Sequence, residues 1–267
     1  GVMRWVSRAS DRMISVLNTK CYADSPSQAR FLVTEGVIPA RKIAVVGNGS
    51  LAGVDMKRFN PDQWSFTAKQ EIRKHLGLEV SSKVIIFVGR ISRDKGIAEL
   101  IAAFYKLLNM NYDIDLILVG PQDQDCGGIN SLNLKEAEQC TRIHYIGYTE
   151  YPEIYLAISD IFCLPSYREG FGTVVIEAAA MGLPTVGTSI YGITDAIVDG
   201  ETGILVPPKN DHKLMEALKR LIDHPDELKK MGKSAKERCD RLFNTNKFNE
   251  KFIEEYFNIL KNKKMLD

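Results

Sequence analysis

The chain has 267 residues, of which 45% are hydrophobic and 26% charged, and its formal net charge is +1 at pH 7. These values are typical of an ordinary soluble globular protein with one large domain or two modest ones. The small net charge argues against a nucleic-acid partner, and no apolar run approaches the ~20 residues of a membrane span.

The cysteines and histidines give no sign of a metal site. Five cysteines are scattered at positions 21, 126, 140, 163 and 239, and the four histidines do not cluster with them. The number of cysteines is odd and no pair has the spacing of zinc ligands. We therefore expect reduced thiols, a cytoplasmic setting and no bound metal.

The first 60 residues predict a helix–strand–helix–strand piece. Its elements are Met3 to Leu17, Cys21 to Ala23, a helix capped by Ser25 that runs to about Glu35, and Lys42 to Val46. We expect this piece to be too small for its own sheet and interpret it as the tail of an N-terminal domain otherwise missing from the chain. The alternative is that its strands add edges to the sheet of the next domain.

A glycine-rich turn and a connecting segment follow. Gly47, Gly49 and Gly53 have the spacing GxGxxxG, so the GxGxxG signature of nicotinamide binding is not matched. The segment from Asp55 to Pro61 indicates an interdomain connection, and a helix is expected from about Thr67 to Leu76.

From Lys83 onward, strands and helices alternate. The predicted strands are Val84 to Arg90, Leu116 to Gly120, Arg142 to Tyr148, Ile161 to Leu164, Pro184 to Gly187 and Ile204 to Val206. The predicted helices are Gly96 to about Leu108, Tyr151 to Ile158, Thr173 to Met181, Asn210 to Asp223, Pro225 to Leu242 and Lys247 to Lys261; Cys126 to Cys140 is expected to be a polar loop with a short helix. Such alternation predicts a doubly wound parallel α/β sheet, with ligands at the carboxyl ends of its strands.

Two cations follow the first of these strands, in the segment GRISRDKG. Arg90 closes the strand and Lys95 precedes the next helix, so both are expected at the mouth of the sheet. Two cations beside a helix N-terminus can hold a diphosphate and stabilise charge as it leaves. The alternative is a solvated loop whose cations pair with Asp94 and Glu99.

Two carboxylates bracket the start of a later helix, in the stretch REGFGTVVIEAAAMGLP. Glu169 precedes a turn flanked by Gly170 and Gly172, and Glu177 lies about one turn into the helix. The free N–H groups of a helix start favour a phosphate, and glutamates accept hydrogen bonds from vicinal diols. The alternative is a helix start stabilised by an acidic residue acting on the helix dipole.

These motifs, together with DGETGILV (Asp199 to Val206), resemble the retaining glycosyltransferases of the GT-B fold, of the large family-4 type. The resemblance covers nearly the whole chain from about Ser25. It implies that Arg90 and Lys95 hold the diphosphate of a nucleotide-diphosphate-sugar, that Glu169 meets the sugar hydroxyls, and that Glu177 meets the ribose hydroxyls.

The resemblance also implies a set of residues that line the donor site through their backbone. Gly170, Phe171, Gly172 and Thr173 are expected to face the sugar and phosphate, and the base is expected near Gly120 and Ile146 to Tyr148. Gly89 and Val174 complete the expected donor site. The resemblance further implies transfer with retention, to a glycan or lipid-linked acceptor in bacterial surface polysaccharide synthesis, without a metal or other cofactor. Asp113-Ile114-Asp115 has the spelling of a metal motif, but we expect it at the wrong edge of the sheet.

The expected domain organisation has three parts. Residues 1–60 are the remnant of the N-terminal (acceptor) domain and the linker, residues 61–244 are the Rossmann-like donor-binding domain, and residues 245–267 are a helix crossing back towards the N-terminal domain. The aromatic stripe of that helix is expected to be exposed; the alternative is that the helix packs on its own domain. Its basic end, Lys261 to Lys264, is either a solvated tail or a peripheral contact at the inner face of the membrane.

The sequence does not name the sugar, the base or the acceptor, although a UDP-sugar is the first expectation and a GDP-sugar the next. The chain by itself is expected to bind donor and to transfer little. Two other functions stay open, namely a non-catalytic nucleotide-sugar-binding module and a sugar-nucleotide epimerase of the same architecture.

Overall fold

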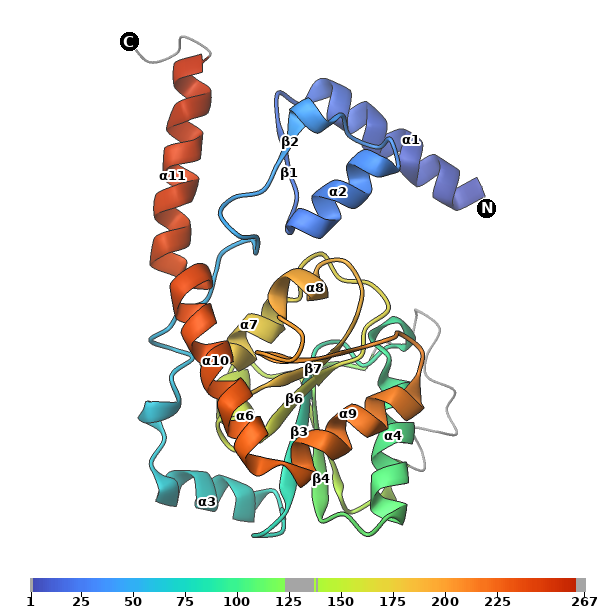
Figure 1. Ribbon diagram of the computed structural model, residues 1–267, viewed down its shortest axis with the longest axis vertical. Coiled ribbons are helices and arrows are strands. Elements are labelled where there is room, and N and C mark those ends of the chain that lie inside the picture. Colours follow the sequence, from blue (N-terminus) through green and yellow to red (C-terminus); the bar gives the residue numbers. More distant parts are fainter. Residues whose placement is uncertain (1, 123–136, 138, 263–267) are drawn as a thin grey trace.

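The computed structural model describes residues 2–122, 137 and 139–262 (Figure 1). In this part of the chain, six parallel strands form the main sheet in the order β5-β4-β3-β6-β7-β8. The strands are β3 (Lys83–Val88), β4 (Ile114–Val119), β5 (Ile143–Gly147), β6 (Ile161–Leu164), β7 (Thr185–Thr188) and β8 (Gly203–Val206). This is the strand order of a doubly wound sheet, so the predicted fold class is confirmed.

Helices cover both faces of the main sheet. They are α3 (Phe66–His75), α4 (Ile97–Asn109), α6 (Pro152–Ala157), α7 (Thr173–Ala180), α8 (Ile193–Ala196), α9 (Asp211–Asp223) and α10 (Pro225–Phe243). Helix α4 packs against α9, and α7 packs against α10, as Figure 1 shows. The expected polar loop from Cys126 to Cys140 lies mostly outside the described residues.

The core is built on the continuous apolar runs that the sequence predicts as strands. Every residue of β4 and of β6 is buried, as are the four central residues of β3. A strand covered by helices on both faces needs apolar side chains on both of its faces, which explains the absence of polar alternation.

The N-terminal elements differ from the prediction in one respect, since they form a sheet of their own. The elements are α1 (Val2–Leu17), β1 (Cys21–Tyr22), α2 (Pro26–Thr34), the 3-10 turn η1 (Ala40–Lys42) and β2 (Ile43–Ala44). Strands β1 and β2 pair in parallel as a two-stranded sheet of their own among the described residues, so the expectation of no separate sheet was wrong. They also add no edge to the main sheet.

Side-chain hydrogen bonds stabilise this small N-terminal unit, because its two strands are very short. The ammonium of Lys42 donates to the carbonyls of Ser15, Val16 and Asn18 at the end of α1, at 2.8, 2.9 and 3.1 Å. Cations at a helix C-terminus satisfy carbonyls that lack an intrahelical partner. As predicted, the hydroxyl of Ser25 caps α2 by accepting from the N–H of Gln28 at 3.1 Å.

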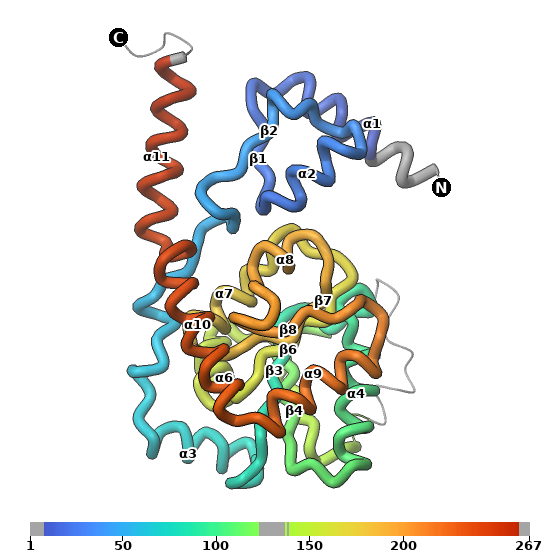
Figure 2. The backbone as a smooth tube through the Cα atoms, viewed as in Figure 1, coloured from blue at the N-terminus to red at the C-terminus, as the bar shows by residue number. Residues whose placement is uncertain are grey.

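The last described helix, α11 (Thr245–Asn262), returns to lie beside the N-terminal unit (Figure 2). Glu255 on α11 pairs with Lys20 and accepts from the hydroxyl of Tyr22 at 3.1 Å. The aromatic stripe of α11 is exposed as predicted, at Phe252, Ile253, Tyr256 and Phe257. No described helix has the length and apolar content needed to cross a membrane.

Candidate functional site

The site lies where the connections of the main sheet diverge. Strands β3 and β6 are neighbours, yet the chain after β3 leads to β4 on one side and the chain after β6 leads to β7 on the other. A crevice opens at the carboxyl ends of two such strands. Arg90 and the 3-10 turn η3 (Arg93–Lys95) follow β3, while Glu169 and Gly170 follow β6.

Glycines let the turns at this edge touch one another. Gly96 has a φ of +70°, and a Cβ atom placed on it would lie 2.1 Å from the carbonyl oxygen of Pro165. Gly120 has a φ of +136°, and its Cβ would lie 1.9 Å from the carbonyl oxygen of Gly89. Only glycine combines these backbone angles with so close an approach. The ends of β3, β4 and β6 are therefore held in direct contact.

Lys95 and Glu169 meet across the crevice. The Lys95 ammonium is ion-paired with the Glu169 carboxylate, and their side chains are only 17% and 14% exposed. The Ser166 hydroxyl donates to the same carboxylate at 2.9 Å. The structure thus pairs Lys95 with Glu169, in place of the alternative partners Asp94 and Glu99.

The two other acids near η3 have partners of their own. Asp94 accepts from the hydroxyl of Ser92 at 2.6 Å and from Arg168 at 3.4 Å. These contacts, led by the Ser92 hydrogen bond, hold the pKa of Asp94 below its usual value. Glu99 accepts from the hydroxyl of Tyr167 at 2.5 Å. Both acids thus have hydrogen-bond partners other than Lys95.

A hollow of about 350 Å³, which we call the central pocket, opens over this ion pair. Its lining residues are Gln28, Arg90, Asp94, Lys95, Arg168, Glu169, Gly170 and Tyr191. The structure therefore brings together four of the predicted site residues. Gln28 and Tyr191 were missed, because they come from segments far apart in the sequence and no motif links them.

The turn into α7 has the predicted form. Gly172 caps the helix with a left-handed φ of +79°, and the helix starts at Thr173. The Phe171 side chain is 3% exposed and packs edge-on against Phe243, with ring centroids 5.2 Å apart. Val174 is half-buried against the core. Only the backbone of Phe171 can therefore face a ligand, and the first N–H groups of α7 provide an anion site.

Glu177 lies apart from the central pocket, in an environment of its own. Its charged neighbours are Arg58 and Glu153, and the Arg58 guanidinium donates to Glu153 at 2.9 Å. Burial raises the pKa of Glu177 above its usual value; Arg58 opposes this shift and Glu153 adds to it. Of the four side chains expected to contact the donor, three line the central pocket. The fourth, Glu177, lies one helical turn beyond the start of α7.

The residues expected near the base lie at the carboxyl ends of β4 and β5. The N–H of Gly120 donates to the carbonyl of Gly147 at 2.8 Å, which joins the two strand ends. Ile146 is half-buried against the core, and Tyr148 is 74% exposed. They border the crevice without lining the central pocket.

Helix α8, which the sequence did not predict, connects the N-terminal unit to the site. The Asp195 carboxylate accepts from the N–H of Ser27 at 2.9 Å and from its hydroxyl, and the N–H of Gly192 donates to the same hydroxyl at 2.7 Å. Phe31 stacks on Tyr191 with centroids 5.0 Å apart. These contacts seat α2 over the central pocket.

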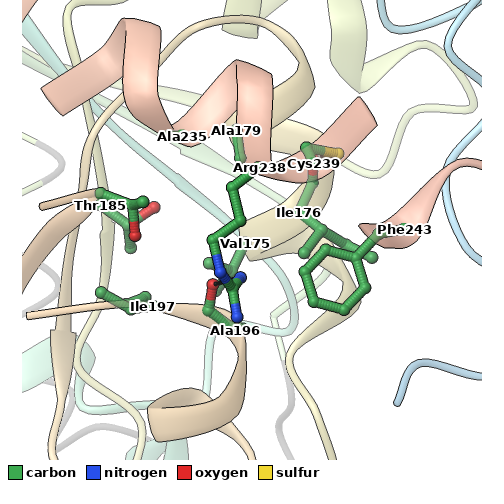
Figure 3. A pocket seen from close by; sticks show the side chains of 11 residues that line it. Val175, Ile176, Ala179, Thr185, Ala196, Ile197, Ala235, Arg238, Cys239 and Phe243 are labelled. Atoms are coloured by element: carbon green, nitrogen blue, oxygen red, sulfur yellow. Dashed lines mark hydrogen bonds between the residues drawn. The ribbon is translucent and has the colours of Figure 1, made fainter. Parts of the chain in front are cut away.

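Helix α8 is also anchored by helix α10 and by the turn after β6. Figure 3 shows Arg238 reaching from α10 towards Ala196; its guanidinium donates to the carbonyls of Asp195 and Ala196, both at 2.8 Å. A Cβ on Gly192 would lie 2.6 Å from the carbonyl oxygen of Gly170. The position of α2 is thereby coupled to the backbone beside Glu169.

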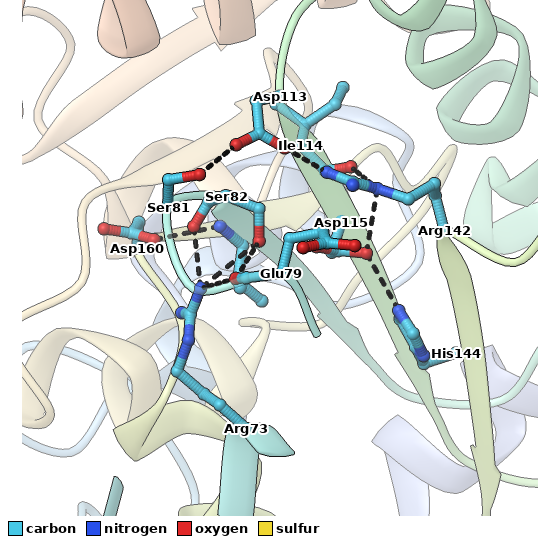
Figure 4. A network of polar contacts seen from close by, with 11 residues as sticks. Arg73, Glu79, Ser81, Ser82, Asp113, Ile114, Asp115, Arg142, His144 and Asp160 are labelled. Atoms are coloured by element: carbon cyan, nitrogen blue, oxygen red, sulfur yellow. Dashed lines mark hydrogen bonds and ion pairs between the residues drawn. The ribbon is translucent and has the colours of Figure 1, made fainter. Parts of the chain in front are cut away.

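The Asp113-Ile114-Asp115 motif lies at the opposite, amino-terminal edge of the sheet, as predicted. Figure 4 shows Asp113 and Asp115 bound to Arg142, and Asp115 also meets His144 at 2.9 Å. This network ties the starts of β4 and β5 together. In the described part of the chain, no three His, Cys, Asp or Glu side chains are grouped so that they could hold a metal ion.

Comparison with known sequences gives consistent matches. The family model described as "Glycosyl transferases group 1" matches residues 68–238. The capsular polysaccharide biosynthesis glycosyltransferase CapM of Staphylococcus aureus is 29% identical over 243 residues, covering 91% of this chain and 62% of CapM. The D-inositol 3-phosphate glycosyltransferase of Corynebacterium glutamicum (strain R) is 32% identical over 197 residues, covering 69% of this chain and 45% of the relative.

Solved structures share the fold. A sucrose-phosphate synthase from Thermosynechococcus elongatus matches with a TM-score of 0.80 and 25% identity, over 96% of this chain and 62% of that one. Anabaena Alr3699/HepE, solved in complex with UDP and glucose, matches with a TM-score of 0.81 and 20% identity, over 94% of this chain and 67% of that one. The chain spans about half to two thirds of the length of the curated relatives it matches.

Proposed function

The chain belongs to the glycosyl transferases group 1 family, and we propose that it binds a nucleotide-diphosphate-sugar whose sugar is transferred to an acceptor with retention of configuration. Family membership confirms the resemblance seen in the motifs. The observation that carries the proposal is the Lys95–Glu169 ion pair in the central pocket, which Arg90 and Gly170 also line.

Arg90, Lys95 and the first N–H groups of α7 together suit a diphosphate. In the proposed complex, the Lys95 ammonium moves from Glu169 to the phosphate oxygens, and the freed carboxylate accepts a hydrogen bond from a sugar hydroxyl. As the bond between sugar and diphosphate breaks, negative charge grows on the leaving group, and the two cations stabilise it. We propose that the transfer needs no metal ion, since these side chains supply the positive charge.

Glu177 is proposed to accept hydrogen bonds from the ribose. Its place one helical turn beyond the α7 start suits a ligand that extends from the central pocket along that helix. The base would then lie at the strand ends near Gly120, Ile146 and Tyr148. A UDP-sugar is proposed first and a GDP-sugar next; HepE, which shares the fold, has been solved with UDP.

The acceptor is proposed to be a glycan or a lipid-linked glycan in bacterial surface polysaccharide synthesis. The support is the similarity to CapM, whose name places it in capsular polysaccharide synthesis. A cytoplasmic protein, with peripheral contact at the inner face of the membrane, fits such an acceptor.

Thermal unfolding of the 267-residue chain in the presence of UDP, GDP, ADP and their glucose conjugates tests the donor proposal. A ligand at 100 times its Kd adds about 2.7 kcal/mol to the free energy of unfolding, which raises Tm by several degrees. We expect the largest rise with UDP-glucose or UDP. No rise with any nucleoside diphosphate would refute donor binding.

A further inference from the structure

A second hollow, of about 280 Å³, adjoins the central pocket, and we call it the side pocket. Its lining residues are Arg90, Arg93, Asp94, Tyr167, Arg168 and Lys209. Arg90, Asp94 and Arg168 line both pockets, so they form a shared wall. A molecule in the side pocket would therefore lie next to the Lys95–Glu169 pair.

The side pocket concentrates positive charge. Among its described lining residues, four are cationic and one, Asp94, is acidic, which gives 4 − 1 = +3, whereas the whole chain has a net charge of +1. The Asp94 carboxylate already accepts from Ser92 and Arg168. A concave surface of one sign of charge attracts a counter-ion, and guanidinium groups match the oxygens of a phosphate.

The backbone at Lys209 indicates that this lysine is held in place. Its φ is +60°, a left-handed conformation that glycine adopts readily and lysine rarely does. Such conformations persist only where the surroundings impose them, and they cluster at ligand sites. Lys209 also lies two residues before the start of α9, where the helix dipole adds positive potential.

Tyr167 orients Lys209 towards the side pocket. The Lys209 ammonium lies 5.0 Å from the centroid of the Tyr167 ring. The Tyr167 hydroxyl donates to Glu99, and its N–H donates to the carbonyl of Asp94 at 2.8 Å. Burial raises the pKa of Tyr167, so the phenol keeps its proton and the ring stays fixed by that hydrogen bond. A cation fixed over an aromatic ring is available to a ligand with little loss of side-chain entropy.

We propose that the side pocket binds a phosphate group of a second ligand, beside the donor diphosphate. This inference rests on the proposed function, because the donor diphosphate is assigned to Arg90, Lys95 and the start of α7. Arg93 and Lys209 have no part in that assignment, so the side pocket offers a second anion its own two cations. The ligand class is therefore a phosphate-bearing molecule that is bound together with the donor.

Inorganic phosphate, titrated into the 267-residue chain by calorimetry at about 10 mM ionic strength, is a suitable probe, since exposed charges are weakly screened there. The variant is Arg93→Gln/Lys209→Gln. Its matched control, Lys229→Gln/Lys230→Gln, removes two exposed cations from α10 and leaves both pockets intact. Each titration is repeated with the protein saturated with UDP.

We expect phosphate to bind wild type and control alike, with and without UDP, and at least tenfold more weakly to the pocket variant. The UDP affinity of the pocket variant should stay within twofold of wild type. Equal loss of phosphate binding in the control, or complete displacement of phosphate by UDP, would overturn the inference, because phosphate would then report general charge or the donor site. Failure of wild type to bind UDP would instead refute the proposed function, whatever phosphate does.

Discussion

Replacing Gly96 with alanine tests whether contact between the turns after β3 and β6 builds the site. Gly77, at the end of α3, provides a matched control, since both glycines have a φ of +70°. A Cβ on Gly77 would meet nothing within 4 Å, whereas one on Gly96 would lie 2.1 Å from the carbonyl oxygen of Pro165. The two substitutions therefore share the backbone strain and differ only in the close approach.

The expected magnitudes follow from that difference. A left-handed conformation destabilises an alanine by about 1–2 kcal/mol, which is the full effect expected for Gly77→Ala. Gly96→Ala adds overpacking, typically about 1–3 kcal/mol, since the two turns must separate by roughly 1 Å. We expect its free energy of unfolding to fall by about 2–5 kcal/mol in total.

Urea unfolding of both variants, with a common m value, measures these free energies. Calorimetry with UDP then measures the site: affinity should fall at least tenfold in Gly96→Ala and stay within twofold in Gly77→Ala, because α3 lies at the other edge of the sheet (Figure 1). Equal destabilisation and equal UDP affinity in the two variants would refute the reasoning.

Three further predictions concern other parts of the site. In the full-length enzyme, Lys95→Ala or Arg90→Ala should lower turnover about 100-fold through lost stabilisation of the leaving diphosphate, measured by sugar transfer; turnover within threefold of wild type would contradict this role. Asp195→Asn weakens the hydrogen bonds from Ser27 and should lower the free energy of unfolding by about 1–2 kcal/mol in urea, where an unchanged midpoint would count against the contact. Burial raises the pKa of Glu177, so the folded protein binds this proton more tightly than the unfolded chain, and stability is lost as pH rises to the folded pKa. Glu177→Gln should therefore gain stability relative to wild type as pH rises from about 4 to 7. If the difference in urea midpoint between variant and wild type stayed constant over that range, the raised pKa of Glu177 would be disproved.

The strands of the main sheet could be predicted to within a residue or two. Ile161 to Leu164 was predicted with its observed bounds, because a short apolar run ended by proline leaves few alternatives. Local spacing also placed Ser25 at the cap of α2 and Gly172 before α7, since cap residues act within one turn of the helix start.

What the sequence did not predict depends on contacts between distant segments. Helix α8 is four residues long and is held by Ser27 and Arg238, neither of which is near it in the sequence. The pairing of β1 with β2 rests on two residues each and on helix contacts around them. Gln28 and Tyr191 enter the central pocket for the same reason, through the packing of α2 on α8.

The most direct test of the donor site is a crystal structure of the chain with UDP bound. We predict that the diphosphate lies within hydrogen-bond distance of the Arg90 guanidinium, the Lys95 ammonium and the N–H groups at the start of α7, with Lys95 released from Glu169. A nucleotide bound elsewhere, or a diphosphate that leaves the Lys95–Glu169 pair untouched, would contradict the assignment.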